Sequence, residues 1–299
     1  MIEGNIDVEK KIHLEALFYG DRGVQQLFQP AHMADLRKFM YKLPKQVPVK
    51  ALGTGSNIVI RNGGFEGAIV MLDKRFGGFE LLPKNRVRVG AGALTTDVVQ
   101  KAKRCGLDLT FLAEVPGTIG GAISSNAGFN GKSIGDYFLR ATTIGRDGTV
   151  KTIKRREFLS TEDLLVNLAD TVIVQVILEL EQDTPESLNQ RYIDLKHRHE
   201  QVYSRYPLKT GHAFCLPHRS KNKLSEPFLS HVADALVSLG AFQDSRSQLR
   251  LDPDHPNIIF AKSKSDFEEL EQFGNKIRSE CREKLNTELD WKIKFLGKK

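Results

Sequence analysis

Cysteine is scarce in this chain, and no long hydrophobic run interrupts its 299 residues. The three cysteines, Cys105, Cys215 and Cys281, are odd in number and widely separated, which argues against a disulfide framework and fits a reducing cytoplasm. Every apolar run is much shorter than the roughly 20 residues that a membrane-spanning helix needs. The first residues also lack the basic-then-apolar order of a signal peptide. We therefore expect a cytoplasmic protein with no membrane partner.

The net charge of +7 raises the question of nucleic-acid binding. The basic residues are spread along the chain, with only short clusters at 151–156 and 191–205 and few aromatic residues between them. A nucleic-acid partner is therefore not expected. A positive net charge would equally favour the binding of a phosphate-bearing small molecule. We predict no metal site.

The alternation of apolar and polar residues predicts strands in the first two thirds of the chain. A glycine turn separates neighbouring strands within 47–72, and Asp147-Gly148 marks the turn of a hairpin. The expected strands lie within 47–72 and at 84–92, 138–153 and 171–181.

Helices are predicted where apolar residues recur at helical spacing. Thr95 or Thr96 is expected to cap the first long helix. Residues 185–207 form a polar, partly helical connector, and an amphipathic helix is expected over 263–286 with Ser265 near its cap. Since strands and helices mix without a regular βαβ repeat, the predicted class is α+β.

A short glycine-rich stretch, GTGSN at 53–57, separates two of the predicted strands. Gly53 and Gly55 give the backbone freedom, and successive amides in such a tight turn form a concave site for anions. It is not a Walker A loop, because no Gly-Lys-Ser/Thr follows. It is not a Rossmann loop either, because the third glycine is absent and a strand follows. Taken alone, it is equally well a plain hairpin turn with polar caps.

A second glycine-rich stretch, VPGTIGGAISSNAGFNG at 115–131, favours a ligand-binding site over a plain hairpin turn. It holds five glycines among 17 residues and contains no lysine, histidine or carboxylate. Backbone of this kind lets N–H groups approach a ligand closely but supplies no side-chain chemistry. The two loops, about sixty residues apart in sequence, predict a site for both ends of a pyrophosphate. The ligand would be large and anionic and would bring its own reactivity.

The two stretches together resemble a known flavoprotein family. LGTGSNIVIRNGGFEGAIV (52–70) followed by VPGTIGGAISSNAGFNGKSIGD (115–136) is similar to the UDP-N-acetylenolpyruvoylglucosamine reductases. These proteins, also called UDP-N-acetylmuramate dehydrogenases, belong to the flavoprotein superfamily that includes vanillyl-alcohol oxidase. The similarity covers most of 15–182 and continues more weakly to the C-terminus, where His255 and Asn257 match a family segment. A length of 299 residues fits the short subclass, which lacks a tyrosine-bearing insertion.

The resemblance implies a particular α+β architecture. It consists of a two-subdomain FAD-binding fold of the vanillyl-alcohol-oxidase type and a smaller α+β substrate-binding domain. The C-terminal strand within 287–299 is expected to return to the first subdomain. The implied ranges are 1–72 for FAD-binding subdomain 1, 73–185 for subdomain 2 and 186–286 for the connector and substrate-binding domain.

The resemblance also implies the cofactor and the reaction. In the family, NADPH delivers hydride to FAD, and the enolpyruvyl group of a UDP-sugar is then reduced to give UDP-N-acetylmuramate for peptidoglycan synthesis. One departure lies beside the second loop, where the family often has glycine and this chain has Glu114, which would crowd the cofactor. The implied FAD-binding residues are Gly53, Thr54, Gly55, Ser56, Asn57, Ile58, Pro116, Gly117, Thr118, Ile119, Gly120, Gly121, Ala122, Asn126, Ala127 and Gly128.

The family's catalytic arginine, serine and glutamate are all replaced in this chain. By the resemblance, Glu162 stands at the arginine position, His212 at the serine position and Lys292 at the glutamate position. In the family the serine protonates a carbanion, and the other two groups stabilise an enol-like intermediate. His212 can still donate a proton near neutral pH, whereas Glu162 would repel a substrate carboxylate.

Each of these residues also has an ordinary interpretation. Glu162 is then a solvated surface carboxylate, His212 a loop histidine with a local hydrogen bond, and Lys292 a solvated lysine on an edge strand. Asp290 shares a strand face with Lys292, so it replaces the family's glutamate only after a register shift.

Two hypotheses remain. The first is an active FAD- and NADPH-dependent reductase of a UDP-sugar with a diverged site, in which His212 is the acid. The second is a non-catalytic or repurposed FAD-binding relative that has lost the acid and the charge stabilisers. The sequence makes no prediction of oligomeric state.

Overall fold

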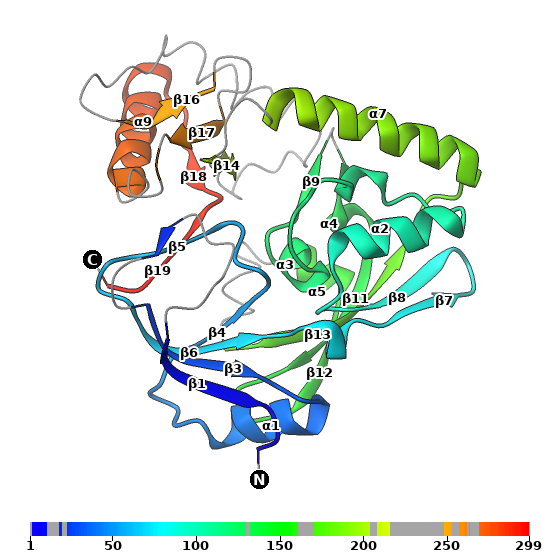
Figure 1. The fold of residues 1–299 in the computed structure, drawn as a ribbon, viewed down its shortest axis with the longest axis horizontal. Coiled ribbons are helices and arrows are strands. Elements are labelled where there is room, and N and C mark those ends of the chain that lie inside the picture. The colour runs from blue at the N-terminus through cyan, green and yellow to red at the C-terminus, as the bar shows by residue number, and fades with distance from the viewer. Residues whose placement is uncertain are drawn as a thin grey trace.

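The computed structural model describes residues 2–10, 18–19, 23–129, 132–160, 170–203, 208–215, 248–252, 257–261, 263 and 269–298. Figure 1 shows an N-terminal sheet, a larger central sheet with helices along one side, and a C-terminal group of short strands around one helix. The predicted α+β class is confirmed. None of the described helices combines the length and the apolar composition that crossing a bilayer requires. The division into domain ranges stays a prediction.

The N-terminal sheet has four strands in the order β1-β3-β6-β4. Strand β6 pairs in parallel with both β3 and β4, while β1 is antiparallel to β3. Helix α1 covers the sheet because Leu36, Phe39 and Met40 recur at helical spacing and are buried, and the ring of Phe39 stacks on Phe28. The strands are β1 (Asn5–Lys10), β3 (Val24–Gln29), β4 (Val49–Leu52) and β6 (Phe65–Met71), and the helix is α1 (Met33–Lys42).

The central sheet has five strands in the order β12-β11-β13-β8-β7, and every neighbouring pair is antiparallel. The predicted hairpin is confirmed: β11 pairs with β12, and the turn between them places Gly148 at φ +73°, a conformation that suits glycine. The predicted strands of 84–92 and 171–181 are confirmed as β8 and β13. The strands are β7 (Phe79–Leu82), β8 (Arg86–Gly90), β11 (Phe138–Ile144), β12 (Val150–Lys154) and β13 (Val172–Glu179).

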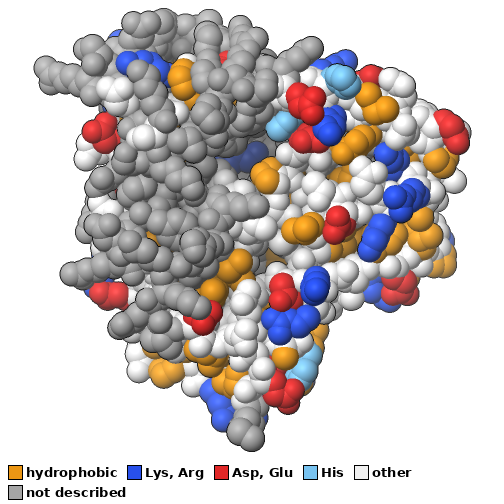
Figure 2. Space-filling view, viewed as in Figure 1, with side chains coloured by type: hydrophobic (Ala, Val, Ile, Leu, Met, Phe, Trp, Pro, Cys, Tyr) orange, Lys and Arg blue, Asp and Glu red, His pale blue; other side chains and the backbone are white. Residues whose placement is uncertain are grey.

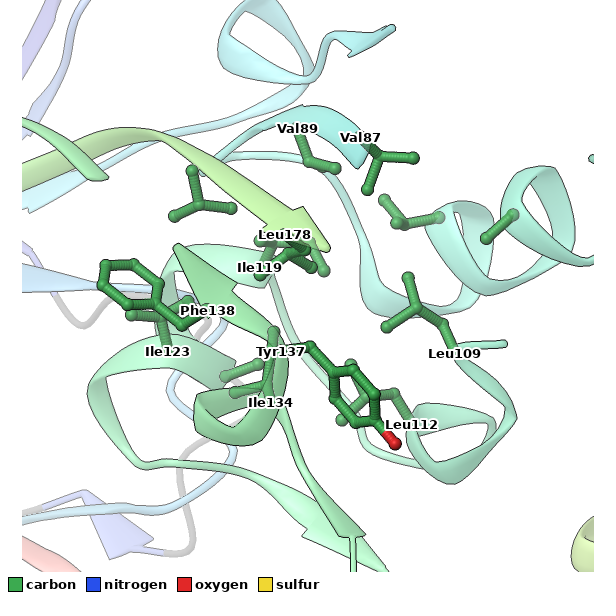
Figure 3. Packing of buried hydrophobic residues seen from close by; sticks show 14 of the residues in the cluster. Val87, Val89, Leu109, Leu112, Ile119, Ile123, Ile134, Tyr137, Phe138 and Leu178 are labelled. Carbon is green, nitrogen blue, oxygen red and sulfur yellow. The ribbon is translucent and has the colours of Figure 1, made fainter. Parts of the chain in front are cut away.

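Four helices pack on or beside this sheet around one hydrophobic cluster (Figure 3). Val87, Val89 and Leu178 come from the sheet, and Ile119 and Phe138 meet them as fully buried side chains. The helices are α2 (Thr95–Arg104), α3 (Ile119–Ser124), α4 (Ile134–Tyr137) and α7 (Pro185–Tyr203). Three short helical segments complete this part of the chain: η1 (Lys74–Phe76), η2 (Thr110–Leu112) and α5 (Arg155–Ser160).

The predicted helix near 95 is present, but the predicted threonine cap is wrong. The cap position is Leu94, which makes no side-chain capping bond. Thr95 is fully buried, and its hydroxyl donates to the carbonyl oxygens of Val115 and Gly117 instead. Its backbone N–H also donates to Gly117 O at 3.0 Å. Thr95 therefore holds the second glycine loop against the start of α2.

The C-terminal group packs on helix α9, which shares a hydrophobic cluster with Phe214, Ile259 and Ile293. Helix α9 confirms the predicted amphipathic helix but begins at Leu270, and Ser265 lies outside the described residues. The elements are β14 (Leu208–His212), β15 (Phe214–Cys215), β16 (Arg250–Leu251), β17 (Ile258–Ala261), α9 (Leu270–Leu285) and β18 (Asp290–Trp291).

The last strand returns to the N-terminal part of the molecule, as predicted. Strand β19 pairs in parallel with β5, and β2 pairs with the other edge of β5. In Figure 1 the red C-terminal chain, which includes β19, runs from the C-terminal group down to the blue strands of the N-terminal part. The three strands are β2 (Phe18–Tyr19), β5 (Ile58–Ile60) and β19 (Lys294–Leu296).

Candidate functional site

A cavity of about 420 Å³ lies where the three parts of the molecule meet. Its walls come from four segments: the first glycine loop, the second glycine loop with the residues around it, helix α7, and the C-terminal group. Cavities of this size are typical of small-molecule sites. Both predicted loops therefore face one space.

The two glycine loops contact each other, although they lie far apart in sequence. A Cβ at Gly53 would lie 2.7 Å from Thr118 Oγ1, and one at Gly117 would lie 3.3 Å from Thr54 Oγ1. Ser56 Oγ donates a hydrogen bond to Pro116 O at 3.4 Å. A side chain at Gly53 would force the Thr118 hydroxyl to move and to release the N–H of Gly121, so glycine favours the close approach.

Backbone conformation explains two further glycines at this contact. Gly55 has φ +86° and Gly117 has φ +110°, values that residues with a Cβ rarely adopt. The Pro116 ring fixes the backbone just before the second of these positions. The loops thus present main chain to the cavity, with few bulky side chains.

Two polar atoms in the first loop are buried beside the cavity with no hydrogen-bond partner among the described residues. They are Thr54 Oγ1 and Asn57 Oδ1. Burying a polar atom unpaired costs about 1–3 kcal/mol, so such atoms usually have a bound partner. A ligand rich in hydroxyl and phosphate groups supplies acceptors for the threonine hydroxyl and donors for the asparagine oxygen. The loop therefore fits a polar cofactor such as a flavin dinucleotide.

The second loop is partly helical, which its glycines did not suggest. Residues 119–124 form α3, and Ile119 and Ile123 point into the hydrophobic core. Gly120 donates its N–H to Ala91 O at 2.9 Å, and a Cβ there would lie 3.0 Å from the Ala91 side chain. The sequence signal that could have predicted this helix was the spacing of Ile119 and Ile123, which lie four residues apart.

Most of the predicted cofactor residues line the cavity. Ile119 and Gly120 do not line it, because they pack on the core and on Ala91. Asn126 does not line it either; its Oδ1 accepts the N–H of Gly135 at 2.9 Å. The predicted residues that line it are Gly53, Thr54, Gly55, Ser56, Asn57, Ile58, Pro116, Gly117, Thr118, Gly121, Ala122, Ala127 and Gly128.

Glu114 lies in the cavity wall, next to the second loop. Its carboxylate is 3.9 Å from Nδ1 of His199, which lines the cavity from α7. Burial raises the pKa of Glu114, and the charge of Glu200 adds to this, while Lys196 opposes it. The predicted crowding at this position thus takes the form of a partly buried acid that keeps its proton to a higher pH than usual.

Helix α7 is a wall of the cavity that the sequence did not reveal. It contributes Leu195 and His199, and Figure 1 shows it lying over the helices of the central part. Its position is fixed by Arg191, which donates to Asp108 at 2.6 Å and to Asp183 at 2.8 Å. The only sequence signal that α7 lines a cavity was the spacing of Leu195 and His199, which lie four residues apart on one helix face.

Asp108 is the buried centre of this attachment, with 1% of its side chain exposed. Lys132 approaches the same carboxylate at 3.4 Å, and the Thr110 hydroxyl and N–H both donate to it. Burial favours the neutral acid, but these hydrogen bonds and the charges of Lys132 and Arg191 outweigh it, so the pKa of Asp108 lies below its usual range. Asp108 therefore stays ionised and holds α7 in place.

The three family catalytic positions have different outcomes. Lys292 lines the cavity; its N–H donates to Ala213 O at 2.8 Å, and its carbonyl accepts from Asn57 Nδ2 at 2.9 Å. His212 ends β14, where the backbone is described and the side chain is not. Glu162 lies outside the described residues, as does His255. Lys294, which the sequence did not single out, also lines the cavity.

Asn257 supports the segment that carries His212. Its side-chain oxygen accepts the N–H of Phe214 at 2.8 Å, and its side-chain nitrogen donates to the carbonyl of Phe214 at 3.0 Å. Its own carbonyl accepts the N–H of Ala213 at 2.8 Å. Asn257, which matched a family segment, thus fixes the backbone at Ala213 and Phe214, directly after His212. Ala213 is also the residue whose carbonyl accepts the N–H of Lys292.

Comparison with known proteins places these features in context. A sequence model of the FAD binding domain family matches residues 24–154, which include both glycine loops. The UDP-N-acetylenolpyruvoylglucosamine reductase of Dinoroseobacter shibae is 31% identical over 272 residues, covering 90% of this chain and 88% of the relative. A protein of the same name from Caulobacter vibrioides is 29% identical over 282 residues, covering 91% of this chain and 88% of the relative.

A solved structure shows the same fold over the whole length. UDP-N-acetylenolpyruvylglucosamine reductase from Thermus caldophilus superimposes with a TM-score of 0.70 at 19% sequence identity. The superposition covers 99% of this chain and 100% of the other. At that identity, the likeness establishes the fold.

Proposed function

The chain belongs to the UDP-N-acetylenolpyruvoylglucosamine reductase family, and from this premise we propose its reaction and the role of each wall of its cavity. The protein is an FAD-dependent oxidoreductase. It reduces the enolpyruvyl group of a UDP-sugar with hydride from NADPH, giving UDP-N-acetylmuramate for peptidoglycan synthesis. The observation that carries this proposal is the contact of two glycine loops at one cavity, beside two buried polar atoms without partners among the described residues.

The residues that hold FAD come from the two loops. The main chain around Gly53–Ser56 and Pro116–Thr118 approaches the cofactor closely, because the glycines leave no side chains in the way. Thr54 and Asn57 supply the unpaired hydroxyl and amide oxygen. When bound, FAD supplies the two-electron chemistry that none of these side chains can perform.

The remaining walls control charge and water around the reacting group. Leu195 of α7 and Phe129 near the end of the second loop line the cavity, and apolar cover of this kind excludes water. Lys292, which the resemblance puts at the position of the family's glutamate, lines the cavity. His212 remains the proposed proton donor, since the asparagine clamp at Asn257 fixes its segment beside Lys292.

A non-catalytic FAD-binding relative is the competing function. The curated reductases match over about nine tenths of this chain, and this length of similarity favours the reductase. Cytoplasmic location and the absence of a nucleic-acid partner stay predictions. On the face shown in Figure 2, Lys and Arg side chains alternate with Asp and Glu over the described residues.

The test is the flavin content of the purified protein and its NADPH oxidation. Wild-type protein is expected to be yellow and to oxidise NADPH faster when the enolpyruvyl UDP-sugar is added. Yellow protein without substrate-dependent oxidation would favour the non-catalytic relative, and colourless protein that cannot be reconstituted would contradict both functions. In His212→Ala, turnover should fall by about 10²–10⁴-fold, the usual contribution of a general acid, while FAD content stays the same. Unchanged turnover would remove His212 as the donor.

A further inference from the structure

Asn57 joins the first glycine loop to the C-terminal segment 292–296. Its side-chain Nδ2 donates to Lys292 O at 2.9 Å, and its backbone carbonyl accepts the N–H of Lys294 at 3.1 Å. The second bond begins the parallel pairing of β19 with β5, in which Lys294 lies opposite Ile58. Lys292 and Lys294 both line the cavity, so Asn57 holds one wall of the cavity against the loop that forms another.

The bond to Lys292 fixes the orientation of the Asn57 carboxamide. A carbonyl oxygen accepts hydrogen bonds but cannot donate them, so the atom that faces Lys292 O is the amide nitrogen. The amide oxygen, Oδ1, is on the other arm of the planar group. It is buried and has no hydrogen-bond partner among the described residues, and Asn57 lines the cavity. Because Oδ1 only accepts, the partner that suits it is a donor in the cavity.

We infer that Asn57 is a positioning residue that couples FAD binding to the docking of segment 292–296. The inference rests on the proposed FAD-dependent function. The donors that FAD offers to Oδ1 are the hydroxyl groups of its ribityl chain and ribose, since its phosphates only accept. A buried amide oxygen without a partner is costly, and a docked segment keeps Oδ1 in that position. Docking therefore becomes more favourable when a cofactor hydroxyl bonds Oδ1.

The coupling acts in both directions and extends toward the proposed proton donor. By linkage, the docked segment strengthens FAD binding by the same factor by which FAD strengthens docking. The N–H of Lys292 donates to Ala213 O at 2.8 Å, and Ala213 directly follows His212 in the chain. The wall that carries Lys292 is therefore fully docked, beside the backbone of the proposed donor, only when FAD is bound.

Amide hydrogen exchange of segment 292–296, measured by mass spectrometry with and without saturating FAD, tests the coupling. Exchange reports how often the N–H groups of Lys292 and Lys294 lose their bonds. In wild type, FAD should slow exchange of this segment by about tenfold, a usual factor for two coupled sites. In Asn57→Ala with saturating FAD, the slowing should fall to roughly twofold or less.

Asn57→Asp is a second variant of nearly the same size. It keeps an oxygen toward the cavity but has no N–H to donate to Lys292 O, so it should also lose the dependence of exchange on FAD. Slowing by FAD as large as in wild type, in either variant, would overturn the inference. Faster exchange by the same factor with and without FAD would also overturn it, because the bond would then only stabilise the segment.

Thr54→Val is the control for the loss of a cofactor contact. Thr54 Oγ1 is also buried beside the cavity, and it has no hydrogen-bond partner among the described residues, including those of segment 292–296. The valine keeps the shape of the side chain and removes the hydroxyl. This variant should bind FAD more weakly, but once it is saturated, FAD should slow exchange of the segment as it does in wild type.

Arg61→Gln is the control for a contact that holds the same segment without facing the cavity. Arg61 follows β5, donates to Glu271 of α9 at 2.8 and 3.0 Å and to Gly297 O at 2.8 Å, and is not among the residues that line the cavity. Its loss should speed exchange of the segment equally with and without FAD. The factor by which FAD slows exchange should therefore stay as in wild type.

Failure of the coupling is distinct from failure of the proposed function. Flavin absorbance of the same samples reports whether FAD is bound. Wild-type protein that binds no FAD would overturn the proposed function, and the coupling with it. Wild-type protein that binds FAD without any change in exchange of segment 292–296 would overturn only the coupling. Slowed exchange in a protein that transfers no hydride would overturn only the reductase reaction.

Discussion

The two glycine loops and the lysine-bearing C-terminal wall meet at one cavity but are built on different principles. The loops present main chain, and their geometry depends on missing side chains at Gly53 and Gly117. The opposite wall, from the C-terminal segment, presents the long side-chain residues Lys292 and Lys294 instead of glycine. A main-chain site tolerates almost no change at its glycines, whereas a wall of side chains accepts new side chains without altering the backbone. This difference fits the expectation, drawn from the family resemblance, that the cofactor motifs persist while the three catalytic positions are substituted.

The largest expected effect comes from filling the contact between the loops. In Gly53→Ala, the new Cβ would lie 2.7 Å from Thr118 Oγ1, which would have to move and lose its bond to the N–H of Gly121. Overpacking of about 3 kcal/mol corresponds to a loss of FAD affinity of roughly 100-fold, measured by flavin fluorescence. Gly78→Ala is the control, because a Cβ there would meet nothing within 4 Å. Wild-type FAD affinity in Gly53→Ala would show that the loop contact is not needed.

The next effect tests whether the C-terminal wall also depends on close packing. Gly274 of α9 lies under the ring of Trp291, and a Cβ there would lie 2.0 Å from the Trp291 ring. Gly274→Ala should therefore lower the free energy of unfolding by about 2–3 kcal/mol, seen as a lower melting temperature. An unchanged melting temperature would contradict this packing.

Helix α7 is a further wall of the cavity, and its attachment can be titrated. The folded-state pKa of Asp108 lies below its unfolded value of about 3.9, so its contribution to stability is present above that pH and is lost as the pH falls through the folded value. Asp108→Asn should lower stability at pH 7 by about 2 kcal/mol, because Arg191 loses a charged partner. The difference between the two proteins should shrink below pH 4. A constant difference at all pH values would contradict the assigned ionisation.

The smallest expected effect comes from Glu114. Its raised pKa means that it loses its proton at a higher pH than usual, and the resulting negative charge faces a site for a diphosphate. FAD affinity of wild type should therefore decrease as the pH rises through that pKa. Glu114→Gln should be flat over this range and bind FAD about threefold more tightly at neutral pH, as a weakly screened like charge implies. The measurement is FAD affinity of the apoprotein against pH, and an identical pH profile in both proteins would contradict it.

The sequence predicted the features that local chemistry determines. Glycine freedom at Gly55 and Gly117 and alternation in β8, β11 and β13 depend on neighbouring residues, so they could be recognised without a structure. The match of two separated motifs predicted the cofactor site, because such a pair rarely occurs by chance, and both motifs line one cavity.

Long-range contacts account for what the sequence did not predict. Thr95 looked like a helix cap, but its hydroxyl bonds the second loop. Helix α7 is polar along most of its length, so the spacing of Leu195 and His199 alone did not identify them as cavity residues. The bond from Arg191 to Asp108 holds the helix at the cavity. Lys294 could have been found from its spacing, because it lies two residues after Lys292.

Product formation by the FAD-loaded protein tests the central claim most directly. The enolpyruvyl UDP-sugar is incubated with NADPH and wild-type protein, and the reaction is followed by mass spectrometry. We expect UDP-N-acetylmuramate, which differs from the substrate by two added hydrogens, and we expect none when FAD is removed. Unchanged substrate in the presence of tightly bound FAD would contradict the claim that this cavity still performs the family's reduction.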